Sequence, residues 1–170
     1  MAVASGWHRT LWACAVLGSS VCLPAWAATP VCDAVRPDTV AQRFQSQHAD
    51  FYFQATPGLK QAVTPALWSA LRNHYRCAER EGLCHLDYDP WLGAQDGDMA
   101  GSPRFQVTQQ TADRARVDMH FQLSLGPSQP LQARRVTLVL AAVAPPACWR
   151  VDDLITPQGD SLAQRYRQPN

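Results

Sequence analysis

The stretch Arg-Val-Asp-Met-His-Phe-Gln-Leu-Ser-Leu, Arg116 to Leu125, decides the fold class of this chain. Apolar side chains alternate along it with polar or charged ones. Because successive side chains of a β-strand point to opposite faces, we expect one face to be buried and the other to meet water. The apolar face consists of Val117, Met119, Phe121, Leu123 and Leu125. The pattern predicts a half-buried strand, which is typical of antiparallel sheets.

Further strands are predicted on both sides of this segment. The ranges with strand character are Arg104 to Gln109, Leu131 to Val143 and Cys148 to Ile155. The middle range becomes apolar on both faces from Val136 onward, as a central strand does. The connections Gly126-Pro127-Ser128 and Ala144-Pro145-Pro146 are short turns, which favour antiparallel neighbours.

The clearest helix prediction runs from Pro65 to about Glu81. Thr64 offers an N-cap hydroxyl, proline suits the first helical turn, and Gly82 offers a stop. The apolar stripe at helical spacing consists of Leu67, Trp68, Leu71, Tyr75 and Ala78. We therefore expect an amphipathic helix with one buried face.

Two further helices are predicted at the ends of the domain. The first is capped by Asp38 or Thr39 and runs to about Phe53. Its imperfect stripe consists of Val40, Phe44, Gln47 and Phe51. The second is a short final helix that Gly159-Asp160 caps and that carries Leu162 and Tyr166.

Helices that precede a run of antiparallel strands predict a single α+β domain, in which the helices cover one face of a bent sheet. Between the two parts, Cys84 to Pro103 is rich in Asp, Gly and Pro. A loop of this length is unusual in a compact domain. We expect it to be packed by Trp91 and Leu92 or to take part in function.

Three short motifs resemble the YbjP-like family of uncharacterised bacterial envelope proteins. They are Asp-Pro-Trp-Leu-Gly-Ala-Gln-Asp-Gly (Asp89 to Gly97), Trp-Arg-Val-Asp-Asp-Leu-Ile (Trp149 to Ile155) and Gly-Asp-Ser-Leu (Gly159 to Leu162). The resemblance covers roughly residues 45 to 167. It implies a fold similar to the nuclear transport factor 2-like or cystatin-like cone, in which a strongly curved antiparallel sheet wraps helices.

The N-terminus predicts export. Arg9 precedes an apolar run, Leu11 to Val21, and Ala25-Trp26-Ala27 has the small residues of a cleavage site. We expect a signal peptide over residues 1–27 and a mature domain over residues 28–170, located in the periplasm or secreted, with no transmembrane segment left. The alternatives are an uncleaved anchor and lipidation at Cys22. Val21 disfavours lipidation because a small residue normally precedes a lipidated cysteine, and here the chain departs from the lipoprotein members of the family.

The cysteines of the mature chain fit an oxidising compartment. Their number is even, and they are Cys32, Cys77, Cys84 and Cys148. Among the three possible pairings, the simplest joins Cys77 to Cys84 and Cys32 to Cys148. A metal site that uses Cys84 and His85 is the weaker interpretation, because no Cys-x-x-Cys spacing supports it.

Charge and motifs exclude several function classes. The net charge of +1 shows no basic excess, so we expect no nucleic-acid partner. The sequence contains no nucleophile elbow, HExxH, P-loop or dinucleotide-binding glycine motif. We expect no cofactor and no metal.

Asp153 is the acid of greatest interest. Strand alternation places it on the face of Trp149 and Val151, among apolar side chains. In a cone-shaped pocket it could act as an acid or base with His120, since folds of this shape include isomerases and dehydratases. The alternative, which we favour, is a structural carboxylate bonded to backbone or to an arginine. His120 lies on the polar face of its own strand.

Three other groups have both a functional and a structural interpretation. The acids Asp87, Asp89, Asp96 and Asp98 lack EF-hand spacing and suit turns better than calcium. The helix arginines Arg72, Arg76 and Arg80 could bind an acidic partner or form a solvated face. The rings of Trp91 and Trp149 could stack on a ligand or pack in the core.

Taken with the family resemblance, these features predict a non-enzymatic binding or interaction module whose partner is a protein or an envelope ligand. A toxin-neutralising immunity protein is a specific version of this hypothesis. The alternative is a small cone-pocket hydratase or isomerase that uses Asp153 with His120 or a tyrosine.

Overall fold

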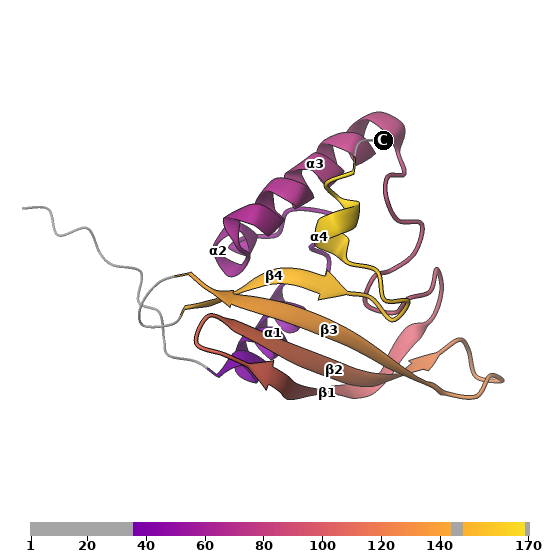
Figure 1. Cartoon of the computed structure of the whole chain (residues 1–170). Coiled ribbons are helices and arrows are strands. Elements are labelled where there is room, and N and C mark those ends of the chain that lie inside the picture. The colour runs from indigo at the N-terminus through magenta and orange to yellow at the C-terminus, as the bar shows by residue number, and fades with distance from the viewer. Residues whose placement is uncertain (1–35, 144–147, 169–170) are drawn as a thin grey trace, which may run out of the picture. The chain divides into compact units, whose positions relative to one another are not determined.

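The computed structural model describes residues 36–143 and 148–168, which form one α+β domain with a four-stranded antiparallel sheet (Figure 1). The helices are α1 (Pro37–Gln47), α2 (Leu59–Ala62), α3 (Pro65–Glu81) and α4 (Leu162–Arg165). The strands are β1 (Asp98–Gln110), β2 (Arg114–Ser124), β3 (Gln132–Ala142) and β4 (Trp149–Ile155). The predicted signal peptide, Cys22 and Cys32 lie outside the described residues.

The strands follow one another across the sheet in the order β1-β2-β3-β4. The alternation predicted for β2 is confirmed at Val117, Met119 and Leu123, which are completely buried. Their partners on β3 continue the apolar face, since Met119 pairs with Val136 and Val117 with Leu138. Two residues differ from the prediction: Leu125 lies beyond the end of the strand and is 43% exposed, and Asp118 on the opposite face is buried. The sheet is not strongly curled (Figure 1), so the cone shape stays a prediction.

Strand β1 begins at Asp98, earlier than the predicted Arg104. The pairing with β2 shifts register between Ala100 and Arg104, and Gly101 adopts a left-handed conformation with φ 74°. A β-bulge thus lets the strand continue through Gly101-Ser102-Pro103, a sequence that is typical of loops. The predicted loop of Cys84 to Pro103 is correspondingly shorter.

Helix α1 differs from the prediction at both ends. It begins at Pro37 with Arg36 as the N-cap, and it ends at Gln47 instead of near Phe53. Phe51 reaches the core through a turn in which its N–H donates to the carbonyl of His48 at 3.0 Å. Its helical spacing from Phe44 was therefore coincidental, although both rings are buried as predicted.

Helix α3 has the predicted bounds and the predicted caps. The Thr64 hydroxyl accepts a hydrogen bond from the Leu67 N–H at 3.2 Å, and Gly82 ends the helix with φ 80°. At α4 the cap differs from the prediction: the Ser161 hydroxyl accepts from the Gln164 N–H at 3.1 Å, in place of a cap by Gly159-Asp160.

The helices pack at two places. Helix α1 contacts the sheet, whereas α2, α3 and α4 gather beside β4 (Figure 1). There the Thr64 N–H donates to the Val151 carbonyl at 2.9 Å, and Val63 forms a parallel bridge with the same residue. This segment therefore covers the outer edge of β4. Within the described part of the chain, none of the helices has the length and apolarity that a membrane crossing requires.

Candidate functional site: a tyrosine-lined pocket

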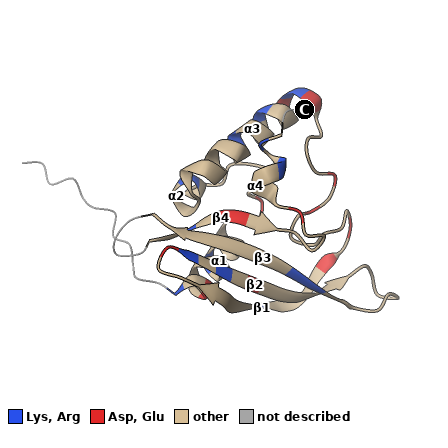
Figure 2. Cartoon of the chain, viewed as in Figure 1, with Lys and Arg blue, Asp and Glu red and all other residues tan. Residues whose placement is uncertain are grey.

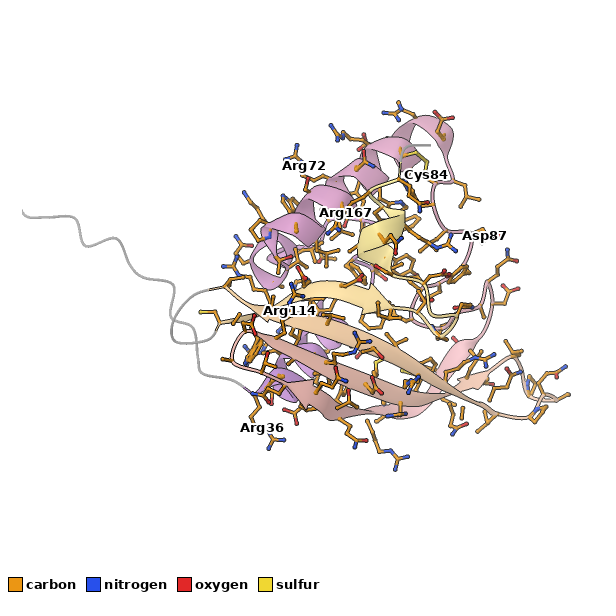
Figure 3. The ribbon with its side chains drawn as sticks, in the orientation of Figure 1. Arg36, Arg72, Cys84, Asp87, Arg114 and Arg167 are labelled. Carbon is orange, nitrogen blue, oxygen red and sulfur yellow. A yellow bond between two sulfur atoms is a disulfide. The ribbon has the colours of Figure 1, made fainter. Side chains whose placement is uncertain are left out.

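A disulfide fixes the loop that follows α3. Cys77 and Cys84 are bonded as predicted, with their Cα atoms 6.0 Å apart. Figure 3 shows Cys84 close to the C-terminal end of α3 and Asp87 further along the segment that leaves it. Next to the disulfide, His85 has φ 65°, the only positive φ of a non-glycine residue in the described ranges. Such positions need support from their surroundings, and here the His85 carbonyl accepts a hydrogen bond from the Arg165 guanidinium at 3.2 Å.

Asp89 holds the middle of this loop. Its Oδ1 atom accepts hydrogen bonds from the backbone N–H groups of Trp91, at 2.7 Å, and Leu92, at 3.3 Å. Its Oδ2 atom accepts from the Tyr52 hydroxyl at 3.0 Å. The Trp91 side chain is only 4% exposed and its indole N–H donates to the Ala49 carbonyl at 2.8 Å. Trp91 therefore packs the loop onto the core, which was the structural alternative at this position.

A pocket of about 760 Å³ lies between this loop, helix α3, the turn at residues 52–55 and the end of α4. This volume is in the range of about 300–1,000 Å³ that is typical of small-ligand sites. The chain has four tyrosines, and all of them line the pocket. They are Tyr52, Tyr75, Tyr88 and Tyr166.

Three of the four hydroxyls have a partner within the fold. Tyr52 donates to Asp89, Tyr75 donates to the Phe51 carbonyl, and Tyr88 donates to Asp160 at 2.7 Å. Asp160 also accepts from the guanidinium of Arg165 at 2.9 Å. The hydrogen bond from Tyr88 is the main reason why the pKa of Asp160 lies below its ordinary value.

The fourth hydroxyl, of Tyr166, is different. The residue is 0% exposed, and its hydroxyl oxygen has no hydrogen-bond partner among the described residues. Burial raises the pKa of Tyr166, and the phenols of Tyr75, Tyr52 and Tyr88 raise it further. An unsatisfied buried hydroxyl costs about 1–3 kcal/mol and calls for an explanation.

His74 forms the wall of the pocket beside Tyr166. The two rings stack with centroids 4.2 Å apart, and His74 is almost completely buried. Its Nε2 atom lies 2.9 Å from the Tyr52 carbonyl, and its Nδ1 atom lies 3.1 Å from Nδ1 of His85. Because a carbonyl only accepts, Nε2–H of His74 donates there, and Nδ1 of a neutral His74 accepts from His85.

The pocket side chains with shifted pKa values are held in their neutral forms near pH 7. Burial raises the pKa values of Tyr52, Tyr75 and Tyr88, with the Asp89 charge adding to the effect at Tyr52. Burial lowers the pKa of His74, and the charge of His85 lowers it further. The phenols thus act as hydrogen-bonding groups, and both nitrogens of His74 are occupied.

The charged residues of the lining are all acidic. Glu79, Asp87 and Asp89 contribute carboxylates, and the lining contains no lysine or arginine. At the rim, Phe53 is 78% exposed and Leu83 is 67% exposed. These are the two most exposed large apolar side chains in the described residues. The pocket therefore combines an aromatic interior, an acidic wall and an apolar rim.

Asp153 lies outside this pocket and is not on the predicted face of β4. The register shifts between Val139 and Leu140, so Val151 pairs with Leu140 whereas Asp153 pairs with Val139. Neighbouring residues of β3 point to opposite faces, and Asp153 therefore lies on the face opposite Val151. The extra residue at Asp152 breaks the alternation on which the prediction depended.

The Asp153 carboxylate is fully used by the fold. Oδ1 accepts from the N–H groups of Leu154, at 2.8 Å, and Ala163, at 2.9 Å, and Oδ2 accepts from the Ser161 hydroxyl at 2.5 Å. Burial raises the pKa of Asp153, and these hydrogen bonds oppose the shift. This is the structural arrangement that we favoured from the sequence.

The structure does not bring His120 and Asp153 together. His120 pairs with Arg135 on β3, four residues from the position where Asp153 pairs with Val139, and the two residues belong to strands separated by β3. A spacing of four residues along a strand is about 13 Å. Neither residue lines the tyrosine pocket.

The other predicted binding residues lie on the surface or in the core. Arg72, Arg76 and Arg80 are exposed on α3, where Figure 2 shows the basic positions repeating along the helix. Arg72 projects outward (Figure 3). Arg76 lines a second groove with Arg167 and Tyr166, and Arg80 lies 4.0 Å from Glu81. Trp149 is partly buried against the core.

Some of the possible metal ligands are used by the fold itself. Of the four loop acids, Asp89 binds the loop backbone and Tyr52, and Asp87, Asp96 and Asp98 are exposed. Within the described residues, the ligand atoms of Cys77, Cys84 and His85 lie within 4.8 Å of one another. The disulfide uses both of these sulfurs.

Sequence reasoning missed Tyr52, Tyr88 and His74 as site residues. Tyr75 and Tyr166 were expected only as packing residues of helices. The available signal was their position: Tyr52, Tyr88 and Tyr166 occur in turns or at a helix end, where their hydroxyls can meet polar groups, whereas Tyr75 lies within α3. No family model, curated protein or solved structure matches this chain.

Proposed function

We propose that this protein is an exported, non-enzymatic binding module of the bacterial periplasm and that the tyrosine pocket is its binding site. The observation that carries the proposal is the Tyr166 hydroxyl, which is completely buried, lines the pocket and lacks a partner among the described residues. A bound ligand would supply that partner. A binding pocket can tolerate such a group because the ligand repays its cost on binding.

The chemistry of the pocket supports binding over turnover. An acid–base catalyst needs a group whose pKa lies near the working pH and whose reactive atom is free to reach the substrate. Here burial moves the pKa values of Tyr52 and Tyr75 away from neutrality. His74 is engaged at both nitrogens.

The proposal includes two predictions made from the sequence, the resemblance to the YbjP-like family and the cone-shaped fold. The domain is then a YbjP-like protein with a cystatin-like cone, cleaved near Ala27 and stapled by a second disulfide between Cys32 and Cys148. Its partner is a protein or an envelope ligand. Neutralisation of an exported toxin is the specific version that the apolar rim at Phe53 and Leu83 favours, since exposed apolar patches mark interaction surfaces.

The second candidate is a hydratase or isomerase that works through a tyrosine. The hydrogen-bonded pairs Tyr52–Asp89 and Tyr88–Asp160 favour it, because a carboxylate can orient a phenol toward a substrate. The separation of His120 from Asp153 disfavours the version that uses these two residues.

A pocket-filling variant tests the proposal. Ala78 lines the pocket on α3, so Ala78→Trp should block it, whereas Ser69→Trp places the same ring on an exposed position of the same helix. Native mass spectrometry after incubation with periplasmic extract should show a ligand on the wild type and on Ser69→Trp, but not on Ala78→Trp. The ligand should be released unchanged by denaturation.

Two outcomes would contradict the proposal. A compound that is chemically converted during incubation would promote the enzyme candidate. Equal retention of the ligand by Ala78→Trp, or no ligand on the wild type, would remove the pocket from consideration as the binding site.

A further inference from the structure

We infer that the ligand of the tyrosine pocket carries a protonated amine on an alkyl chain. This inference rests on the proposed function, because it names the chemistry of the ligand that the pocket would take. It draws on the charge of the lining, its aromatic rings, the orphaned hydroxyl of Tyr166 and the apolar rim.

The charge of the lining is complementary to a cation. Its carboxylates come from two elements: Glu79 from α3, and Asp87 and Asp89 from the loop. Glu79 and Asp87 form no hydrogen bond or ion pair with any described residue, so they are available to a ligand. Arg165, which lies on α4 beside Tyr166, is paired with Asp160 at 2.9 Å. An anion in the pocket would meet these carboxylates and no lysine or arginine of the lining.

The aromatic interior favours the same kind of ligand. The faces of aromatic rings attract cations, and rings grouped around one space can enclose a substituted ammonium. Tyr52, Tyr75, Tyr88 and Tyr166 all line this space, and their raised pKa values keep the phenols uncharged. The phenols therefore add no negative charge. The rings of Tyr52, Tyr75 and Tyr88 are only partly buried and can contact a cation, whereas the Tyr166 ring is covered by His74.

The Tyr166 hydroxyl can accept a hydrogen bond from a cation that carries N–H groups, and the acidic lining favours such a donor. The hydroxyl oxygen is free to accept a hydrogen bond, because no described residue donates to it. A primary ammonium has three donors, whereas a quaternary ammonium has none. Hydrogen bonds that involve a charged donor are roughly twice as strong as neutral ones, so this contact suits a buried position.

The apolar rim of the pocket favours a ligand that has an alkyl chain next to its charged group. Phe53 and Leu83 stay largely exposed in the free domain, and both border the pocket. An alkyl chain that leaves the pocket past these residues would cover them, which is the favourable direction of the hydrophobic effect. Both a free alkyl amine and a lysine side chain of a partner protein have this structure.

Calorimetric titration with defined probes tests the inference. The probes are 1,5-diaminopentane as a free amine, Nα-acetyl-lysine amide as a protein side chain, 1-pentanol as a neutral control and hexanoate as an anionic control. At least one amine should bind with a Kd about tenfold or more below that of either control, which corresponds to about 1.4 kcal/mol. Binding by diaminopentane alone indicates a free amine, and binding by the lysine amide alone indicates a partner's side chain.

Matched variants connect the binding to the residues. Glu79→Gln combined with Asp87→Asn should weaken amine binding about tenfold or more, while Glu81→Gln on the same helix should leave it unchanged. Tyr166→Phe should weaken binding by a similar factor without lowering Tm, because the removed hydroxyl has no partner in the fold. The acids of the double variant are exposed, so its folding should be preserved.

The inference is overturned if the amines bind no better than the neutral and anionic controls. It is also overturned if the Glu79→Gln/Asp87→Asn variant binds amines as tightly as the wild type does. If Ala78→Trp still abolishes retention of a ligand from extract in that case, the proposed function stands and only the ligand class is wrong. If the extract ligand is insensitive to Ala78→Trp as well, both fail.

Discussion

The sheet and the tyrosine pocket are held together by different kinds of contact. On the buried face of the sheet, the contacts are apolar. Fully buried side chains such as Val117 and Leu138 pack against each other from paired strands. Around the pocket, buried rings carry polar atoms, and single hydrogen bonds join segments far apart in sequence, as between Tyr52 and Asp89. The sheet is therefore stabilised by buried apolar surface, whereas the pocket depends on a few specific hydrogen bonds that a ligand can complete.

The largest expected effect comes from a cavity in the sheet. Leu138→Ala should lower the free energy of unfolding by about 2–5 kcal/mol, because Leu138 is completely buried and its site cannot fully collapse. Leu83→Ala at the pocket rim is the matched control, since Leu83 is exposed, and it should change stability by less than about 0.5 kcal/mol. Denaturant titration measures both. Equal losses would show that the two regions do not differ in this way.

The next effect concerns the pocket's covalent link. Replacing both Cys77 and Cys84 by serine should lower the free energy of unfolding by about 2–3 kcal/mol. The loss is moderate because a disulfide that closes a short loop stabilises the fold less than one that closes a long loop. Hydrogen exchange should increase in the loop after α3 and stay low in β2 and β3. Increased exchange in β2 of the folded variant would show that the sheet and the pocket are coupled, which would contradict their independence.

Asp153 provides a smaller test at the boundary between the regions. Asp153→Asn should lower stability by about 1–3 kcal/mol, since the carboxylate accepts hydrogen bonds from Leu154, Ala163 and Ser161. Ligand retention by the pocket should be unchanged in the folded variant. A variant that melts like the wild type and binds normally but has lost function in cells would favour the enzyme candidate.

The smallest effect is a pH dependence centred on His74. Burial lowers its pKa in the folded state below the ordinary value of about 6.5, so the unfolded chain binds more protons between the two values. Stability should therefore fall as the pH decreases from about 7 through this interval. His48 has a lowered pKa as well and contributes in the same direction.

The variant His74→Gln separates the contributions of His74 and His48 to the pH dependence of stability. The glutamine amide can still donate to the Tyr52 carbonyl, and the slope of stability against pH should become shallower while the His48 part remains. Urea unfolding between about pH 5 and 7.5 measures it. An unchanged slope would show that His74 does not titrate between the two states.

The parts of the fold that the sequence predicted well are those with local causes. Helix α3 is bounded by its own cap at Thr64 and its own stop at Gly82, and β2 is defined by alternation. The Cys77–Cys84 disulfide closes between neighbours. None of these requires knowledge of a distant segment.

The predictions that were wrong depended on contacts between distant segments, which the local sequence pattern does not contain. Phe51 has helical spacing from Phe44 but reaches the core through a turn, and the extra residue at Asp152 reverses the face of Asp153. The pocket was not predictable in detail, because its tyrosines come from separate segments that only the folded chain brings together. A buried hydroxyl without a partner, such as that of Tyr166, has no signature in a sequence.

The interruption of β1 bears on how copies of this protein meet. Val63 and Thr64 occupy the outer side of β4, so β1 is the edge that the described sheet leaves open. An open edge is a template for adding a strand from another molecule. Here the strand is broken by the bulge at Gly101, Pro103 contributes no N–H group, and Arg104 adds an exposed charge. The edge of β1 is thereby protected against the strand-to-strand pairing that begins aggregation.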